Sequence, residues 1–81
     1  MDKIVKFLRR LPQKEYEAFL LLMEQIKRDY RKVPHLVSLS GMKNWYRVRI
    51  GRYRIIFYVH ANGVAEIRRI TKRDEQTYEN L

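Results

Sequence analysis

The sequence predicts an α+β protein in which an N-terminal helical hairpin packs on a C-terminal antiparallel β-meander. Apolar residues recur with helical spacing over residues 4–31 and with strand spacing from residue 45 onward. Two glycine-containing turns divide the second region into three strands. Because the chain has only 81 residues, we expect a single domain spanning residues 1–81.

The first helix is expected at the N-terminus. Ile4, Phe7, Leu8 and Leu11 follow the i, i+3, i+4, i+7 spacing that places side chains on one face of a helix. Pro12 ends this segment and suits the first turn of a following helix, where its missing N–H is not needed.

The second helix is expected to run from Gln13 to about Arg31. Its apolar stripe comprises Tyr16, Phe19, Leu20, Met23, Ile26 and Tyr30. Acidic residues lie near its start and basic residues near its end, as the helix dipole favours. We expect the two helices to bury one shared apolar face in the core.

Residues 33–42 are expected to form a connection, after which strands begin. The first two strands are predicted at Trp45–Ile50 and Tyr53–His60, joined by a tight Gly51-Arg52 turn with glycine at its first central position. Asn62-Gly63 is a strong hairpin signal.

The third strand should then run from Val64 to about Thr71, followed by a tail over residues 72–81 that forms a helical turn.

Side-chain alternation in the first strand separates two kinds of residue. It places Trp45, Arg47 and Arg49 on one face and Tyr46, Val48 and Ile50 on the other. The apolar set should pack on the helices. Arg54 interrupts the apolar run of the second strand, and since a buried unpaired guanidinium is costly, we expect it at an edge or an open face. Three arginines can thus converge on one patch.

The charge is strongly one-sided. The chain has 18 Lys and Arg against nine Asp and Glu, a formal net charge of +9. No acidic residue occurs between Asp29 and Glu66, whereas that interval contains Arg31, Lys32, Lys43, Arg47, Arg49, Arg52 and Arg54. Such a block attracts polyanions, most often nucleic acid, although a solvated basic surface is the alternative. Lys43, Arg52 and Trp45 are predicted nucleic-acid contacts, Trp45 by stacking on a base.

Composition argues against several other classes. The chain has no cysteine, and with two histidines and no clustered acids we expect no metal site and no cofactor. Its longest apolar run, at residues 18–23, is too short to span a bilayer, and the N-terminus lacks a secretory signal. We therefore expect a cytoplasmic protein.

Four segments resemble the RelE/ParE superfamily of toxins from type II toxin–antitoxin modules. They read KFLRRLP, SLSG, WYRVRIGRYRIIFYV and IRRITKRDEQTY, and their order and spacing cover nearly the whole chain from Lys6 onward. The resemblance implies a compact α+β toxin that a cognate antitoxin neutralises. In the RelE branch it implies an endoribonuclease that cleaves mRNA on the ribosome. The family's first β-strand is either lost here or rebuilt, since only MDKIV precedes the first helix.

The same resemblance implies a set of catalytic residues. The basic positions of the family's strands and closing pair fall on Arg47, Arg49, Arg54 and Arg73, and the family's terminal tyrosine on Tyr78. Lys72 stands where some members have histidine, and Arg52 where many have aspartate.

Metal-free RNA cleavage uses the ribose 2′-hydroxyl as nucleophile and needs cations to stabilise the charge on phosphate. Arginines suit this task because guanidinium binds phosphate oxygens in bidentate fashion. Tyr78 can stack on a base or donate to the leaving oxygen. Lys72, crowded by Arg73, and His35 are candidate bases, and the ribosome can supply part of the chemistry. The alternatives are a ParE-like inhibitor of DNA gyrase and a catalytically inactive RNA-binding relative.

Overall fold

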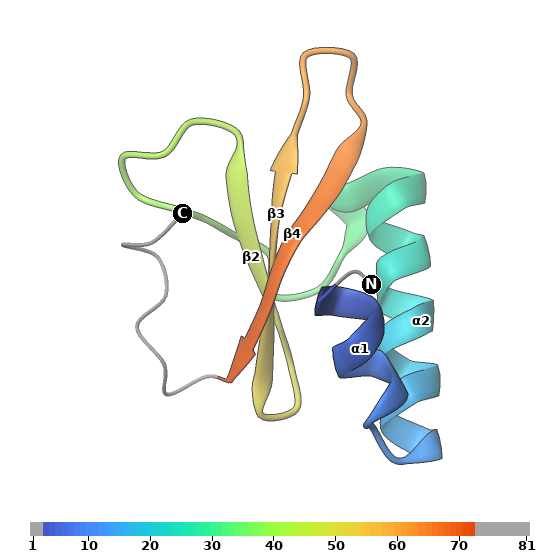
Figure 1. Ribbon diagram of the computed structural model, residues 1–81. Coiled ribbons are helices and arrows are strands. Elements are labelled where there is room, and N and C mark those ends of the chain that lie inside the picture. Colours follow the sequence, from blue (N-terminus) through green and yellow to red (C-terminus); the bar gives the residue numbers. More distant parts are fainter. Residues whose placement is uncertain (1–2, 73–81) are drawn as a thin grey trace.

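Two helices lie against one face of an antiparallel sheet in the computed structural model, which describes residues 3–72 (Figure 1). The elements are α1 (Lys3–Arg9), α2 (Gln13–Asp29), a 3-10 helix η1 (Tyr30–Lys32), β1 (Val37–Ser38), β2 (Trp45–Ile50), β3 (Tyr53–Val59) and β4 (Ala65–Lys72). The strands are ordered β1-β2-β3-β4 and every neighbouring pair is antiparallel. The predicted α+β class is confirmed, and within residues 3–72 no strand precedes α1.

The second helix ends two residues earlier than the sequence predicted. Asp29 has an extended backbone, with φ −160° and ψ 95°, and its carboxylate accepts a hydrogen bond from the Arg31 backbone N–H at 3.2 Å. This cap starts the 3-10 turn, so Arg31 lies outside α2. At the other end, Pro12 precedes α2 and its carbonyl accepts the first helical hydrogen bond, from Tyr16 N–H at 2.9 Å.

The two predicted turns differ in form. Ile50 pairs directly with Tyr53, and Gly51 between them has φ +57°, as a two-residue hairpin turn with glycine at its first central position requires. The Asn62-Gly63 connection is wider, because β3 ends at Val59 and β4 begins at Ala65. His60 and Val64, predicted as strand ends, therefore lie in the loop.

The sheet has four strands, whereas three were predicted. Val37 pairs with Arg47 and Ser38 with Tyr46, so part of the predicted connection forms the edge strand β1. A hydrogen bond from Leu39 N–H to the Trp45 carbonyl, at 2.9 Å, extends this pairing. Two residues are too few to show a period of their own, so this strand is defined by the edge of β2 to which it pairs.

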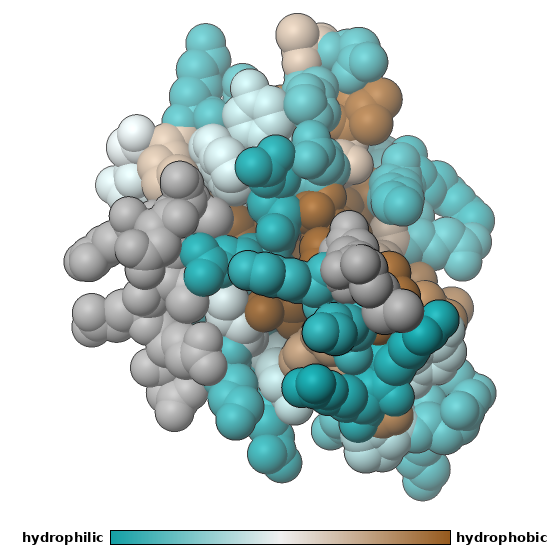
Figure 2. Space-filling model, in the orientation of Figure 1, coloured by the Kyte–Doolittle hydropathy of each residue, from teal (hydrophilic) through white to brown (hydrophobic). Residues whose placement is uncertain are grey.

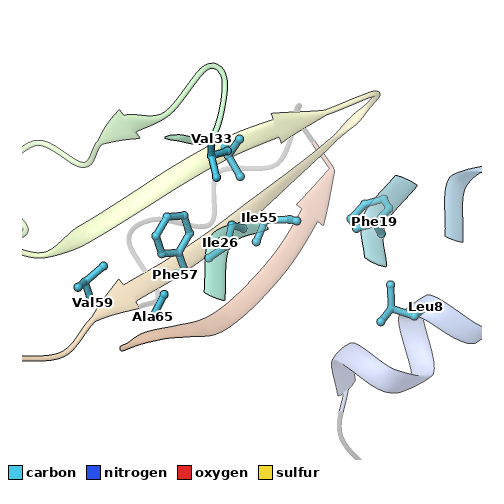
Figure 3. Packing of buried hydrophobic residues seen from close by; sticks show 9 residues of the cluster. Leu8, Phe19, Ile26, Val33, Ile55, Phe57, Val59 and Ala65 are labelled. Atoms are coloured by element: carbon cyan, nitrogen blue, oxygen red, sulfur yellow. The ribbon is translucent and has the colours of Figure 1, made fainter. Parts of the chain in front are cut away.

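The core lies between the helices and the sheet (Figure 3). Its buried hydrophobic residues are Leu8, Phe19, Ile26, Val33, Val48, Ile55, Phe57, Val59 and Ala65. The rings of Phe7, Phe19 and Tyr53 meet edge to face with centroids 5.0–5.6 Å apart, joining both helices to β3. Leu20, predicted in the core stripe, is instead 41% exposed, while Leu22 packs against the core.

A β-bulge changes which residues of β4 share a face. Phe57 pairs with Ile67, but Ile56 pairs with Arg69, so Arg68 is an extra residue in β4. Ile67 and Ile70 both pack against the core, although they are three residues apart. Without the bulge, a spacing of three would place these isoleucines on opposite faces of the sheet. The bulge thus keeps both isoleucines inward and turns Arg69 outward.

Candidate nucleic-acid interface

The sheet has a second face, opposite the helices, which we call the outer face. Residues that pair directly in an antiparallel sheet project to the same side, so the registers define three cross-strand rows on it. The rows are Arg49–Arg54–Thr71, Arg47–Ile56–Arg69 and Trp45–Tyr58–Glu66. Strand alternation and pairing therefore gather on one surface the three arginines that the sequence predicted to converge.

The first row brings two cations face to face. Arg49 lies directly opposite Arg54, and such pairs have Cβ atoms about 4.5–5.5 Å apart. Arg49 is exposed, whereas Arg54 on the central strand β3 is half-buried, and its Nε atom is buried. Arg54 lies on the face of the sheet opposite the helices and not at an edge, because β3 is an inner strand. Like charges directly opposite each other repel, so this row is a position at which an anion would be attracted.

The second row combines two arginines with an apolar residue. Arg47 and Arg69 flank Ile56, which is fully buried although it lies on the outer face. Arg69 was not predicted as a site residue, because simple alternation along β4 assigns it to the same face as Ile67. The Ile67–Ile70 spacing was the signal that could have identified it, since both isoleucines can face the core only with a bulge between them.

The third row holds an aromatic and ionic cluster. The rings of Trp45 and Tyr58 have centroids 5.2 Å apart, and the Arg68 guanidinium carbon lies 5.9 Å from the centroid of Trp45. Glu66 accepts from Arg68 at 2.9 Å through Oε2 and contacts His60 Nε2 at 2.7 Å through Oε1. The hydrogen bond with His60 foremost, and then that with Arg68, lowers the pKa of Glu66.

Glu66 is the acidic residue of the three outer-face rows, and its carboxylate is already bound to side chains beside its own row. Glu66, the first acidic residue after the arginines of β2 and β3 in the sequence, is bound to His60 and Arg68 at the opposite end of the sheet. His60 lies at the hairpin end. The next acids in the sequence, Asp74 and Glu75, lie outside the described residues.

The remaining predicted site residues are distributed around this face. Lys43 is exposed before β2, and Arg52 is exposed in the turn beside the Arg49–Arg54 row. Lys72 is at the same end, but it pairs with Tyr53, whose ring packs with Phe7 and Phe19, so register assigns it to the helix-facing side. Arg73 and Tyr78 lie outside the residues that the structure describes.

His35 occupies an unusual position near the arginines. It has φ +60°, a left-handed conformation that non-glycine residues rarely adopt, and it is exposed. His35 lies two residues before Val37, which pairs with Arg47. Because β1 and β2 are antiparallel, His35 lies toward the Arg49 end of β2.

A groove lies between the helices and the start of β4. It has a volume of about 730 Å³ and is lined partly by Ile4, Val5, Met23, Lys27, Val64 and Ile67. Val5 and Val64 are 41% and 56% exposed, and Figure 2 shows hydrophobic surface framed by hydrophilic residues. β4, which lines one side of this groove, is the last strand in the order of the sheet that residues 3–72 form.

Within residues 3–72, no three His, Cys, Asp or Glu residues gather in a way that could hold a metal ion. No helix in the same range has the length and apolar character needed to cross a membrane.

Comparison with known proteins gives two matches. Residues 1–77 match the family described as the ParE toxin of the type II toxin–antitoxin system parDE. A solved structure, the RelB–RelE antitoxin–toxin complex from Methanococcus jannaschii, is similar with a TM-score of 0.68 and 25% sequence identity, over 89% of this chain and 87% of that one. The search of curated proteins gives no match at the level applied.

Proposed function

Since this chain belongs to the ParE toxin family of type II toxin–antitoxin systems, within the RelE/ParE superfamily, we propose that it acts on RNA as a ribosome-dependent endoribonuclease. The observation that carries this proposal is the direct pairing of Arg49 with Arg54 on the face of the sheet that the helices leave open. An anion between two facing guanidiniums relieves their repulsion and accepts hydrogen bonds from both.

The proposed chemistry is an internal transfer on the RNA chain. The ribose 2′-oxygen attacks the adjacent phosphorus while the bond to the 5′-oxygen breaks, which leaves a 2′,3′-cyclic phosphate and a 5′-hydroxyl. One proton leaves the 2′-hydroxyl and one reaches the 5′-oxygen. Arg49 and Arg54 stabilise the extra charge on the phosphate oxygens, and such preorganised charge is commonly the largest catalytic contribution.

The proton transfers need a donor for the 5′-oxygen and an acceptor for the 2′-proton. Tyr78 donates to the leaving oxygen and Arg73 adds a phosphate contact, as the family resemblance implies. The 2′-proton passes to His35, because register assigns Lys72 to the helix-facing side of the sheet, and the ribosome supplies part of the alignment. His35→Gln should therefore slow cleavage while Lys72→Met has a small effect, and the opposite result would identify Lys72 as the acceptor.

The decisive experiment is cleavage of mRNA on programmed ribosomes by wild-type protein and Arg54→Ala. We expect a loss of about a hundredfold or more in rate, because removal of one preorganised donor to a developing anion typically costs that much. Arg28→Ala is the matched control, since Arg28 is exposed on α2 and pairs only locally with Glu24. Intact transcripts with folded wild-type protein would refute the proposal, and RNA binding without cleavage would indicate an inactive RNA-binding relative.

The family match itself favours a second candidate, inhibition of DNA gyrase. A fold hosts several functions, and a ParE-like toxin needs no RNA chemistry. Supercoiling by gyrase in the presence of the protein separates the two, because a ribonuclease leaves supercoiling unchanged whereas a gyrase inhibitor leaves transcripts intact.

The type II toxin family and the antitoxin–toxin complex both support a cognate antitoxin as partner. We assign its contact to the groove beside β4, where apolar side chains suit an amphipathic segment, and the net charge of +9 suits an acidic one. Val64→Glu should prevent co-purification with the antitoxin, whereas the exposed Leu21→Glu on α2 should not.

A further inference from the structure

Arg68 makes two contacts that are unusual in combination. Its guanidinium lies over the ring of Trp45 at 5.9 Å, and its NH1 group donates to Glu66 Oε2 at 2.9 Å. The side chain is nevertheless 50% exposed and sits on the extra residue of a bulge, so it is held by these two contacts and not by burial. Trp45, Tyr58 and Glu66 form one cross-strand row, which keeps the two contacted groups in a fixed relation.

Arg68 places a planar cation over an aromatic ring while one of its N–H groups donates to a carboxylate, and a nucleobase can make both kinds of contact. The N1–H and the 2-amino group of guanine are adjacent donors in the plane of the ring, arranged as in a guanidinium. We propose that Trp45, Tyr58 and Glu66 form a subsite for a guanine base in single-stranded RNA, and that Arg68 occupies this subsite in the free protein. This inference rests on the proposed action on RNA.

Guanine is favoured because of the donors that a carboxylate requires. An ionised carboxylate only accepts hydrogen bonds, and Glu66 stays ionised because His60 and Arg68 lower its pKa. On the Watson–Crick edge, guanine presents two adjacent donors. Adenine and cytosine each present one donor beside an acceptor, and uracil presents one donor between two acceptors, so these bases turn a lone pair toward the carboxylate. Trp45 and Tyr58 provide stacking that any base can use.

His60 acts as a positioning residue for Glu66. Because the carboxylate can only accept, the 2.7 Å contact requires His60 Nε2 to carry the proton and donate it to Oε1. The imidazole also meets the ring of Tyr58 edge to face, with centroids 5.0 Å apart. These two contacts hold Oε2 toward the side where Arg68 now binds.

The subsite lies away from the paired arginines along the same strands. Trp45 and Arg49 are four residues apart on β2, a separation of about 13 Å along an extended strand. A guanine bound at Trp45 therefore belongs to a nucleotide near, but not at, the phosphate held by Arg49 and Arg54. The row of Arg47 and Arg69 lies between the two positions on the same face.

The test uses Trp45 as its own probe, since it is the only tryptophan of the chain. Tryptophan fluorescence is titrated with pentaribonucleotides that carry guanine, adenine, cytosine or uracil at the centre of a uridine background. We expect quenching with all four, and binding about tenfold tighter for the guanine probe, because the other three bases turn a lone pair toward the carboxylate. Equal affinity for the four probes would overturn the inference.

Two variants separate base reading from simple attraction, with affinity measured by anisotropy of labelled RNA. In Glu66→Gln we expect the guanine preference to fall to within about twofold, since the amide keeps only one acceptor. In Arg68→Ala we expect the preference to persist or increase, because the competitor for Glu66 is gone. A preference that survives Glu66→Gln, or one that disappears in Arg68→Ala, would refute the subsite.

Trp45→Ala tests the stacking contact independently of base identity. We expect affinity for all four probes to fall by about tenfold, within the range measured for loss of base–aromatic stacking. Unchanged affinity in a variant whose circular dichroism matches wild type would contradict the proposal. These titrations contain no ribosomes, so failure of ribosome-dependent cleavage and failure of this subsite are distinguishable.

Discussion

The two faces of the sheet are built from the same strands and have opposite physical character. On the inner face, Val48, Ile55 and Phe57 are fully buried against the helices. On the outer face, the residues that alternate with them include Arg49 and Arg54, which stand directly opposite each other. The inner face contributes stability by burying apolar side chains, whereas the outer face carries the facing arginines on which the proposed RNA binding depends.

The largest expected effect is on the inner face. Phe19→Ala removes a ring that is 1% exposed and meets both Phe7 and Tyr53, so we expect the free energy of unfolding to fall by about 3–5 kcal/mol. Urea denaturation followed by circular dichroism measures it. A loss below about 1 kcal/mol would mean that the inner face does not hold the helices to the sheet.

On the outer face we expect a substitution to raise the free energy of unfolding, the opposite of its effect on the inner face. Arg49→Gln removes one of two facing cations, so we expect the free energy of unfolding to rise by about 0.2–1 kcal/mol. The same substitution should weaken RNA binding, because it removes a phosphate contact. Urea denaturation and RNA titration of the same sample measure the expected gain in stability and the expected loss of affinity. Lower stability together with unchanged binding would make Arg49 a structural residue.

A smaller effect is expected at the rim of the outer face. Arg52 is exposed in the turn next to the Arg49–Arg54 row, so Arg52→Gln should weaken binding to all single-stranded RNA sequences equally. The slope of log affinity against log salt should become less steep by about 0.7, the contribution of one phosphate on a single strand. Lys43→Gln offers the comparison at the other end of the face. An unchanged slope in both variants would place the RNA elsewhere.

The smallest expected effect is a pH dependence at the Trp45 end. The folded-state pKa of Glu66 lies below its ordinary value of 4.5, chiefly because of the hydrogen bond with His60. This stabilisation is present above pH 4.5 and is lost as pH falls through the lower folded-state pKa. The melting temperature of wild type should therefore decrease slightly more than that of Glu66→Gln on acidification below this value. An equal decrease of the melting temperature in the two proteins would mean that the pair of Glu66 with His60 contributes nothing to stability.

Much of the fold could be predicted because its signals are local. The helical stripe of Ile4, Phe7 and Leu8 and the turn at Gly51 each depend on residues close together in the chain. The face assigned to Arg47 and Arg49 was also predictable, since alternation in a strand is a property of consecutive residues. The shift of Leu20 to the surface was not, because the width of the buried stripe depends on how α2 sits on the sheet.

The sequence by itself determined the α+β class, the two strands that carry the arginines, and the separation of cationic from apolar residues in β2. Only the tertiary structure decided which side chains meet across strands. The pairing of Arg49 with Arg54, the edge strand β1, and the bulge that turns Arg69 outward all depend on register. Register is set by the fit of distant apolar residues, such as Ile67 and Ile70, against the helices, and no local period encodes that fit.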